Sequence, residues 1–147
     1  MSRVNSIYHI VINTYQRKMT IPESYKRDLY MYIYGIIRNK GAHLYRMNGI
    51  GNHIHILVNI PASLSLSQFV QSIKQNSSIW LSSNPNFPEW EKWGKEYFAD
   101  SKSVEHIDSI VSYILHQEEH HKVRGFDDEL KSLYITAGFN WREDCLT

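Results

Sequence analysis

The segment Ile50–Ile60 constrains the fold most strongly, because apolar and polar side chains alternate along it as expected of a β-strand. Residues two apart share one face of a strand. One face therefore carries the apolar residues Ile54, Ile56, Val58 and Ile60, which belong to a core. The other face carries His53 and His55, about 7 Å apart along the strand at its usual rise. Two imidazoles at this spacing can converge on one metal ion, or they can be two half-exposed histidines that face water.

Length and composition limit the class of protein. A chain of 147 residues, 42% hydrophobic and 21% charged, is expected to form one globular domain spanning residues 1–147. The net charge of +1 excludes a strongly basic nucleic-acid-binding protein, so any DNA contact must depend on local charge. The sequence shows neither an apolar run near the ~20 residues of a membrane span nor a signal peptide. Together with the single Cys145, this predicts a cytoplasmic protein that does not enter a membrane.

Sequence patterns predict a strand, a helix, two strands, a helix, a strand and a helix. The first half is predicted as strand Ile7–Tyr15, a helix from about Ile21 to Lys40, strand Ala42–Met47, a turn at Asn48–Gly49 and strand Ile50–Ile60. The second half is predicted as a helix from Leu64–Ser67 to Leu81, a short strand Glu96–Ala99, a helix Val104–His121 and a short helix Asp127–Ile135. This order is typical of the α+β class, with a ferredoxin-like antiparallel sheet and helices packed on it.

Tyr113 and Gln117 form a second pair of interest. They lie four residues apart on the helix predicted at Val104–His121, so they share one helical face beside its apolar stripe. A phenol and an amide at that place can simply be core-edge residues that hydrogen-bond to each other. Next to a pair of histidines they can take part in catalysis. An amide oxygen is a hard ligand for Mg²⁺ or Mn²⁺, and a tyrosine hydroxyl is a nucleophile. The four side chains together would form a phosphodiester-cleaving site.

Over nearly its whole length, the chain resembles the HUH transposases with a single catalytic tyrosine, the insertion-sequence-200-like group. The resembling segments are Tyr8–Val11 with Thr14–Arg17, Asn52–Val58, Ser67–Leu81, Tyr113–His121 and Phe126–Leu130. The order and spacing of these segments, with the final helix, carry the resemblance more than any one of them. The segment Trp90–Ser101 departs from the family, because it is looser and more acidic, and it leaves the register of the fourth strand open.

The resemblance implies an activity and the residues that perform it. His53 and His55 match the metal-binding histidines, Gln117 matches the third metal ligand and Tyr113 matches the nucleophile. It implies a divalent metal, Mg²⁺ or Mn²⁺, and DNA transposition by cleavage and rejoining of single-stranded DNA through a 5′-phosphotyrosine. It also implies a hairpin-containing DNA partner and a homodimer. In the family one subunit's tyrosine usually completes the other's histidine pair, and the sequence leaves open whether Tyr113 acts within its own subunit or on its partner.

Basic residues are the predicted DNA contacts, although a solvated surface is the commoner role of any single one. Lys74, on the helix after the histidine strand, is the strongest candidate for a phosphate contact, followed by Arg17 and Lys18. The other local positive charges are Arg38, Lys40, Arg46, Lys122 and Arg124.

Other functional classes fit the residues less well. A histidine-triad nucleotide hydrolase needs a third histidine where this chain has Leu57, and a two-histidine phosphoesterase needs two His-x-Ser/Thr copies that the sequence lacks. Two alternatives stay open. One is a metal-dependent hydrolase, for example a zinc enzyme whose third ligand is His116 or His120, and the other is a non-catalytic DNA-binding descendant of a transposase.

Overall fold

A four-stranded antiparallel sheet forms the centre of the computed structural model, which describes residues 2–119 and 125–141. The strands are β1 (Ile7–Thr14), β2 (His43–Ile50), β3 (His53–Asn59) and β4 (Trp93–Lys102). They lie in the order β2-β3-β1-β4, and every neighbouring pair is antiparallel. The predicted ferredoxin-like α+β fold is confirmed.

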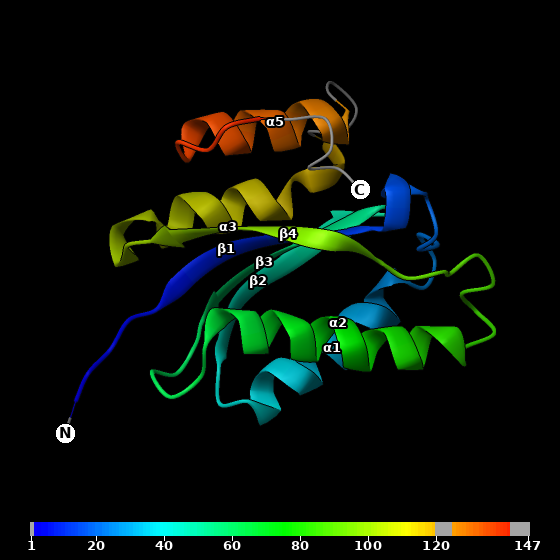
Figure 1. The fold of residues 1–147 in the computed structure, drawn as a ribbon, viewed down its shortest axis with the longest axis horizontal. Coiled ribbons are helices and arrows are strands. Elements are labelled where there is room, and N and C mark those ends of the chain that lie inside the picture. Colours follow the sequence, from blue (N-terminus) through cyan, green and yellow to red (C-terminus); the bar gives the residue numbers. More distant parts are fainter. Residues whose placement is uncertain (1, 120–124, 142–147) are drawn as a thin grey trace.

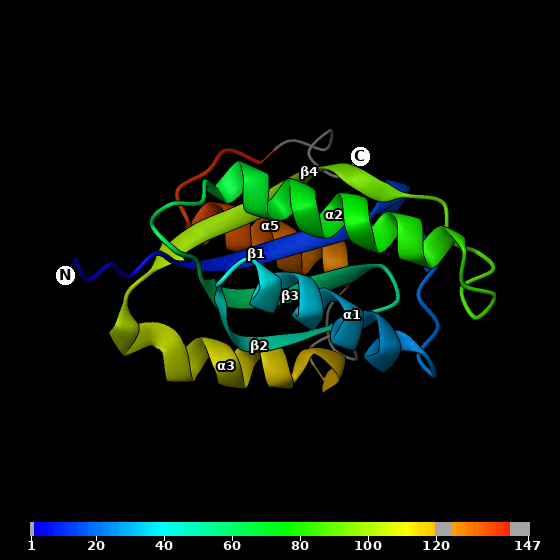
Figure 2. The ribbon, with the colours of Figure 1, turned by 90° about the horizontal axis from the view of Figure 1, so that it is seen from below.

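Two pairs of helices cover the two faces of the sheet (Figures 1 and 2). One face is covered by α1 (Lys26–Asn39) and α2 (Leu66–Ser82), and the other by α3 (Ile107–Leu115) and α5 (Phe126–Thr136). The 3₁₀-helices η1 (Tyr15–Arg17) and η2 (Val104–His106) follow β1 and precede α3. Within the described ranges, every helix is too short or too polar to cross a membrane.

The larger core lies between the sheet and the α1–α2 pair. The apolar face of β3 points into it as predicted, since Ile54, Ile56, Val58 and Ile60 are all at most 3% exposed. The helices contribute a matching set of buried side chains, namely Leu29, Ile33, Ile37, Phe69, Val70, Ile73 and Leu81. The alternation of apolar residues in β3 and the apolar faces of α1 and α2 therefore determine which face of the sheet packs against these two helices.

Two smaller apolar clusters lie on the opposite face of the sheet. In one, Ile114 of α3 packs on Ile7 and Leu57 of the sheet. In the other, Phe126 and Leu130 of α5 pack on Val11 and Phe98. The two clusters leave room for a group of polar side chains between them, over β1 and β3.

The predicted turn at Asn48–Gly49 is wrong, because β2 continues to Ile50 and the chain turns at residues 51–52. Gly49 instead lies where β2 approaches β3 closely. A Cβ atom on Gly49 would lie 2.1 Å from the carbonyl oxygen of His53, so only glycine allows β2 to approach β3 this closely.

The predicted continuous helix from Val104 to His121 is also wrong in the described part of the chain. It begins as η2, and α3 ends at Leu115. The Asn48 side chain donates to the carbonyl oxygens of Ile114 and Leu115 at 3.1 and 3.2 Å, which satisfies the end of α3. Helical backbone resumes at residues 117–119, whereas His120 and His121 lie outside the described residues.

The fourth strand is longer than the predicted Glu96–Ala99. β4 spans Trp93–Lys102 and pairs with the whole of β1, with a register shift between Ile12 and Thr14. At its start, the Trp93 indole N–H donates to the buried hydroxyl of Ser77 on α2 at 2.9 Å. This hydrogen bond links the start of β4, whose register the sequence left open, to α2.

The core makes a direct prediction about stability. We expect Ile73→Ala to lower the free energy of unfolding by about 2–5 kcal/mol, because the side chain is fully buried and its loss leaves a cavity. Ile79 is on the same helix but 65% exposed, so Ile79→Ala is the matched control and should change stability by less than about 0.5 kcal/mol. Urea unfolding of both variants measures the difference, and equal losses would contradict this core assignment.

Candidate active site

Five polar side chains meet between α3, α5 and the sheet. His53 and His55 come from β3, Tyr113 from α3, Gln117 from the turn of helix after α3, and Glu129 from α5. Both histidines and Gln117 are 0% exposed, and Glu129 is 3% exposed. The histidines are therefore not half-exposed to water, and the structure brings together the four residues singled out in the sequence, with a carboxylate added.

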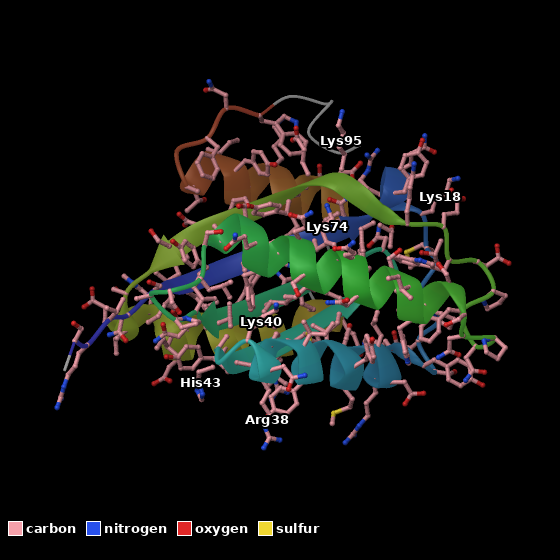
Figure 3. The ribbon with its side chains drawn as sticks, turned by 60° about the horizontal axis from the view of Figure 1, so that its bottom comes forward. Lys18, Arg38, Lys40, His43, Lys74 and Lys95 are labelled. Carbon is pink, nitrogen blue, oxygen red and sulfur yellow. The ribbon has the colours of Figure 1, made fainter. Side chains whose placement is uncertain are left out.

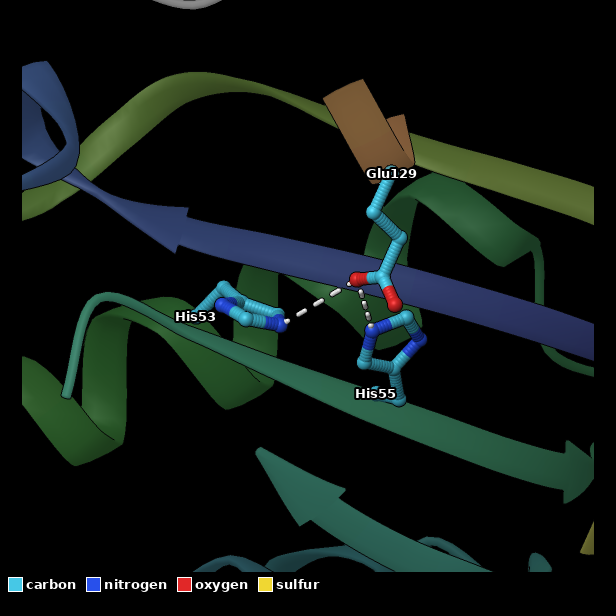
Figure 4. Close-up of side chains that lie close together, drawn as sticks. All are labelled: His53, His55 and Glu129. Carbon is cyan, nitrogen blue, oxygen red and sulfur yellow. Dashed lines mark hydrogen bonds and ion pairs between the residues drawn. The ribbon is translucent and has the colours of Figure 1, made fainter. Parts of the chain in front are cut away.

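The Glu129 carboxylate links the members of this cluster. Its Oε1 atom lies 3.1 Å from His55 Nε2 and 3.5 Å from His53 Nε2. Figure 4 shows the carboxylate directed at both imidazoles. Its Oε2 atom accepts hydrogen bonds from the Tyr113 hydroxyl at 2.5 Å and from Gln117 Nε2 at 3.1 Å. One carboxylate thus touches all four of the other side chains.

The orientation of His53 is set by its neighbours in the chain. Asn52 Nδ2 donates to the carbonyl oxygen of Arg17, which leaves Asn52 Oδ1 to accept from His53 Nδ1 at 2.8 Å. The hydrogen on Nδ1 leaves Nε2 with its lone pair directed into the cluster. Phe126 stacks on the same imidazole, with ring centroids 3.8 Å apart, and shields it from water.

His9 supports the second histidine from behind. Its Nε2 lies 2.8 Å from His55 Nδ1, and both side chains are buried. When His55 Nε2 binds a cation, its hydrogen sits on Nδ1 and donates to His9. This partner orients the ring and fixes its tautomer, as is usual for metal-binding histidines.

Burial favours the neutral form of His53 and of His9. Loss of hydration lowers the pKa of His53 to about 4, although Glu129 opposes the shift. Burial also lowers the pKa of His9 well below its ordinary value, and the neighbouring His55 adds to this effect. A neutral imidazole offers a lone pair to a metal ion.

The donor set fits a divalent cation. The candidate ligand atoms of His53, His55 and Glu129 lie within 4.8 Å of one another, and Gln117 Oε1 lies 3.1 Å from His53 Nε2. Because Gln117 Nε2 donates to Glu129, the amide oxygen faces His53. Nitrogen and oxygen lone pairs therefore converge on one buried point, an arrangement that a cation between them stabilises.

Sequence reasoning missed two residues of this site: Glu129, which belongs to the cluster, and His9, which supports His55 from behind. The signal for Glu129 is its place three residues after Phe126 and next to Leu130, on the side of α5 that faces the sheet, whereas the two acids before it, Asp127 and Asp128, are exposed. The signal for His9 is a single imidazole within an otherwise apolar strand. Neither pattern indicates which residues Glu129 and His9 contact, because these contacts join segments far apart in the chain.

His116 does not join the cluster. It is exposed, and its Nδ1 bonds to the carbonyl oxygen of Ser112 at 2.7 Å. His120, the other possible third ligand of a zinc hydrolase, lies outside the described residues.

The predicted DNA contacts lie at different places around the sheet. Lys74 is on α2, on the face opposite the histidines, and its ammonium donates to the Gly94 carbonyl oxygen at 2.7 Å (Figures 1 and 3). Burial lowers the pKa of Lys74. With Lys95 it lines a hollow of about 400 Å³ between α2 and β4.

Arg17 and Lys18 follow β1. Arg17 lies nearer the cluster, since its Nε pairs with Asp127 of α5 at 2.9 Å. Lys18 pairs with Glu91 at 2.7 Å. The predicted Lys122 and Arg124 lie outside the described residues.

A ferredoxin-like sheet that presents two histidines to a helix-borne tyrosine and glutamine is the arrangement expected of a HUH transposase with a single tyrosine. The family model described as "Transposase IS200 like" matches residues 2–117. The chain belongs to this family of IS200-like transposases.

Named transposases match the sequence of the chain, and solved structures share its fold. The chain is 26% identical to the transposase for insertion sequence element IS200 of Salmonella typhimurium, over 97% of this chain and 94% of the relative. The Salmonella typhi transposase for the same element matches equally well. A putative transposase from Deinococcus radiodurans R1 shares the fold, with a TM-score of 0.62 and 21% identity over 79% of this chain and 93% of the other. A REP-associated tyrosine transposase bound to a REP hairpin also has a TM-score of 0.62, with 14% identity over 82% and 73% of the two chains.

The cluster contributes to stability as well as chemistry. We expect Tyr113→Phe to lower the free energy of unfolding of the metal-free protein by about 1–3 kcal/mol, because it removes a donor to the buried Glu129 carboxylate. Tyr32 is exposed and stacks on Trp80 through its ring, so Tyr32→Phe is the control and should change stability little. Equal effects in denaturant titrations with a chelator would mean that the Tyr113–Glu129 bond is not stabilising.

Proposed function

We propose that the protein is a metal-dependent transposase that cleaves and rejoins single-stranded DNA through a 5′-phosphotyrosine on Tyr113. In this proposal His53, His55 and Gln117 hold the divalent ion, Mg²⁺ or Mn²⁺. One observation carries it: the Tyr113 hydroxyl, the Gln117 amide and both imidazoles meet through Glu129 at a single buried point. A set of unrelated core-edge residues would have no reason to converge in this way.

The strand-transfer step uses the tyrosine oxygen as the nucleophile. That oxygen loses its proton and bonds to phosphorus while the bond from phosphorus to the 3′ oxygen breaks. The 3′ oxygen takes up a proton and leaves as a free 3′-hydroxyl, so one proton is lost and one is gained. Attack by another 3′-hydroxyl reverses the step, so strands are joined without external energy. A divalent ion held by His53, His55 and Gln117 would supply Lewis-acid chemistry, polarising the phosphate and stabilising charge on its oxygens. Glu129 orients the attacking hydroxyl, and Phe126 covers His53.

A hairpin-containing single-stranded DNA is the proposed partner. The transposase of similar fold that is bound to a REP hairpin supports this choice. Arg17, Lys18 and Lys74 are the proposed phosphate contacts, and the near-neutral net charge of +1 favours recognition by DNA shape over nonspecific attraction. We also propose that the active form is a homodimer.

The covalent intermediate provides the test of the nucleophile. Protein, Mn²⁺ and overlapping single-stranded oligonucleotides from both strands of the DNA flanking the gene should give an adduct that survives denaturing electrophoresis. Tyr113→Phe should abolish the adduct, whereas Tyr32→Phe should retain it, because only the former removes the attacking oxygen. An adduct that persists in Tyr113→Phe would show that another residue is the nucleophile.

The position of the label separates the proposed reaction from its alternatives. A 5′-phosphotyrosine retains the 3′-labelled fragment on the protein and releases the 5′-labelled fragment with a free 3′-hydroxyl. A metal-dependent hydrolase releases both fragments, and a non-catalytic DNA-binding descendant releases neither.

The metal requirement is tested on the histidines. His53→Ala should lower Mn²⁺ affinity at least about tenfold and remove metal-dependent cleavage, because it deletes an imidazole ligand. His43→Ala alters a histidine at the exposed start of β2 and should leave both unchanged. Full cleavage by His53→Ala at low Mn²⁺ would contradict the proposed metal site.

A further inference from the structure

We propose that Glu129 of α5 is a fourth protein ligand of the divalent ion, so that a helix beyond the matched part of the family closes the metal site. This inference rests on the proposed metal-dependent function. Glu129 lies outside the family match, and the resemblance of the segment Phe126–Leu130 assigns it no role. The match ends at residue 117, whereas α5 begins at Phe126.

The first argument is the direction of the lone pairs. Asn52 places the hydrogen of His53 on Nδ1, so His53 Nε2 presents a lone pair to Glu129 Oε1 at 3.5 Å. Gln117 presents its amide oxygen to the same nitrogen at 3.1 Å. Three lone-pair-bearing atoms face one another in a buried space, and a cation between them turns this repulsion into attraction.

The second argument is charge. Two neutral imidazoles and an amide leave the full charge of a divalent ion uncompensated in a buried site. Glu129 adds a negative charge at 3.1 Å from the nitrogen of His55, and it is 3% exposed. A carboxylate is also the ligand type that Mg²⁺ and Mn²⁺ prefer.

The third argument is that α5 is fixed in the position that this role requires. Phe126 and Leu130 flank Glu129 and pack on Val11 and Phe98 of the sheet. Phe126 also stacks on His53. Glu129 Oε2 meanwhile accepts from Tyr113 and Gln117, which leaves Oε1 directed at the two histidines. The carboxylate is thus held in one orientation before any ion arrives.

Metal binding without DNA tests this inference directly. Mn²⁺ is titrated into the full chain, and the loss of the free-ion signal in electron paramagnetic resonance gives the affinity. We expect Glu129→Gln to weaken binding at least about tenfold, because it removes the charge while keeping the shape and the buried oxygen. Asp128→Asn is the matched control, since it removes one charge from the exposed neighbouring position, and it should bind like the wild type.

His53→Ala in the same titration separates the two proposals. Weak binding by His53→Ala with wild-type binding by Glu129→Gln would overturn the ligand role of Glu129 and leave the proposed function in place. Wild-type binding by His53→Ala would overturn the metal site and with it the function.

A crystal structure of the wild-type chain soaked in Mn²⁺ covers the case in which Glu129→Gln fails to fold. An anomalous peak at bonding distance, about 2 Å, from Glu129 Oε1 and both histidines is the expected result. A peak bound to the histidines alone, with Glu129 turned away, would overturn the inference.

Discussion

The Glu129 carboxylate is the interaction on which the functional half of the structure depends. Burying a charged group in an apolar layer costs several kcal/mol unless donors surround it. Here the donors come from α3, the segment after it and β3, so the same contacts that stabilise the carboxylate also align Tyr113, Gln117 and His55. Removing one partner therefore disturbs the position of the others. Stability and site geometry are therefore coupled at this point.

The sheet separates this cluster from the larger core. Successive residues of β3 point to opposite faces, so Ile54 and Ile56 pack under α1 and α2 while His53 and His55 reach the other side. A slip of one residue in the pairing of β1 with β3 would exchange the two sets. The apolar face therefore fixes the register, and the register in turn fixes the position of both imidazoles.

Much of this arrangement could be predicted from the sequence, and the failures have physical causes. The alternation in β3 gave the strand and the direction of its histidines, while the family resemblance placed Tyr113 and Gln117 beside them. The turn expected at Asn48–Gly49 was wrong, because Asn-Gly favours turns locally but here Gly49 allows close strand approach. A local sequence pattern cannot show that two strands approach each other closely at that residue. Glu129 and His9 were missed for the same reason, since each acquires its role from partners on other elements.

The two layers of the structure are held by apolar clusters of different size. The α1–α2 layer buries a broad core, whereas α3 and α5 rest on two small clusters with the polar site between them. Elements with fewer buried apolar contacts open at lower free-energy cost than the main core. In the proposed reaction a DNA phosphate must reach His53, His55 and Gln117, which are fully buried, so a helix on this face would have to shift. The smaller apolar clusters on this face lower the free-energy cost of displacing a helix there, compared with the larger core on the other face. The sheet and its register can therefore hold both histidines in place during such a displacement.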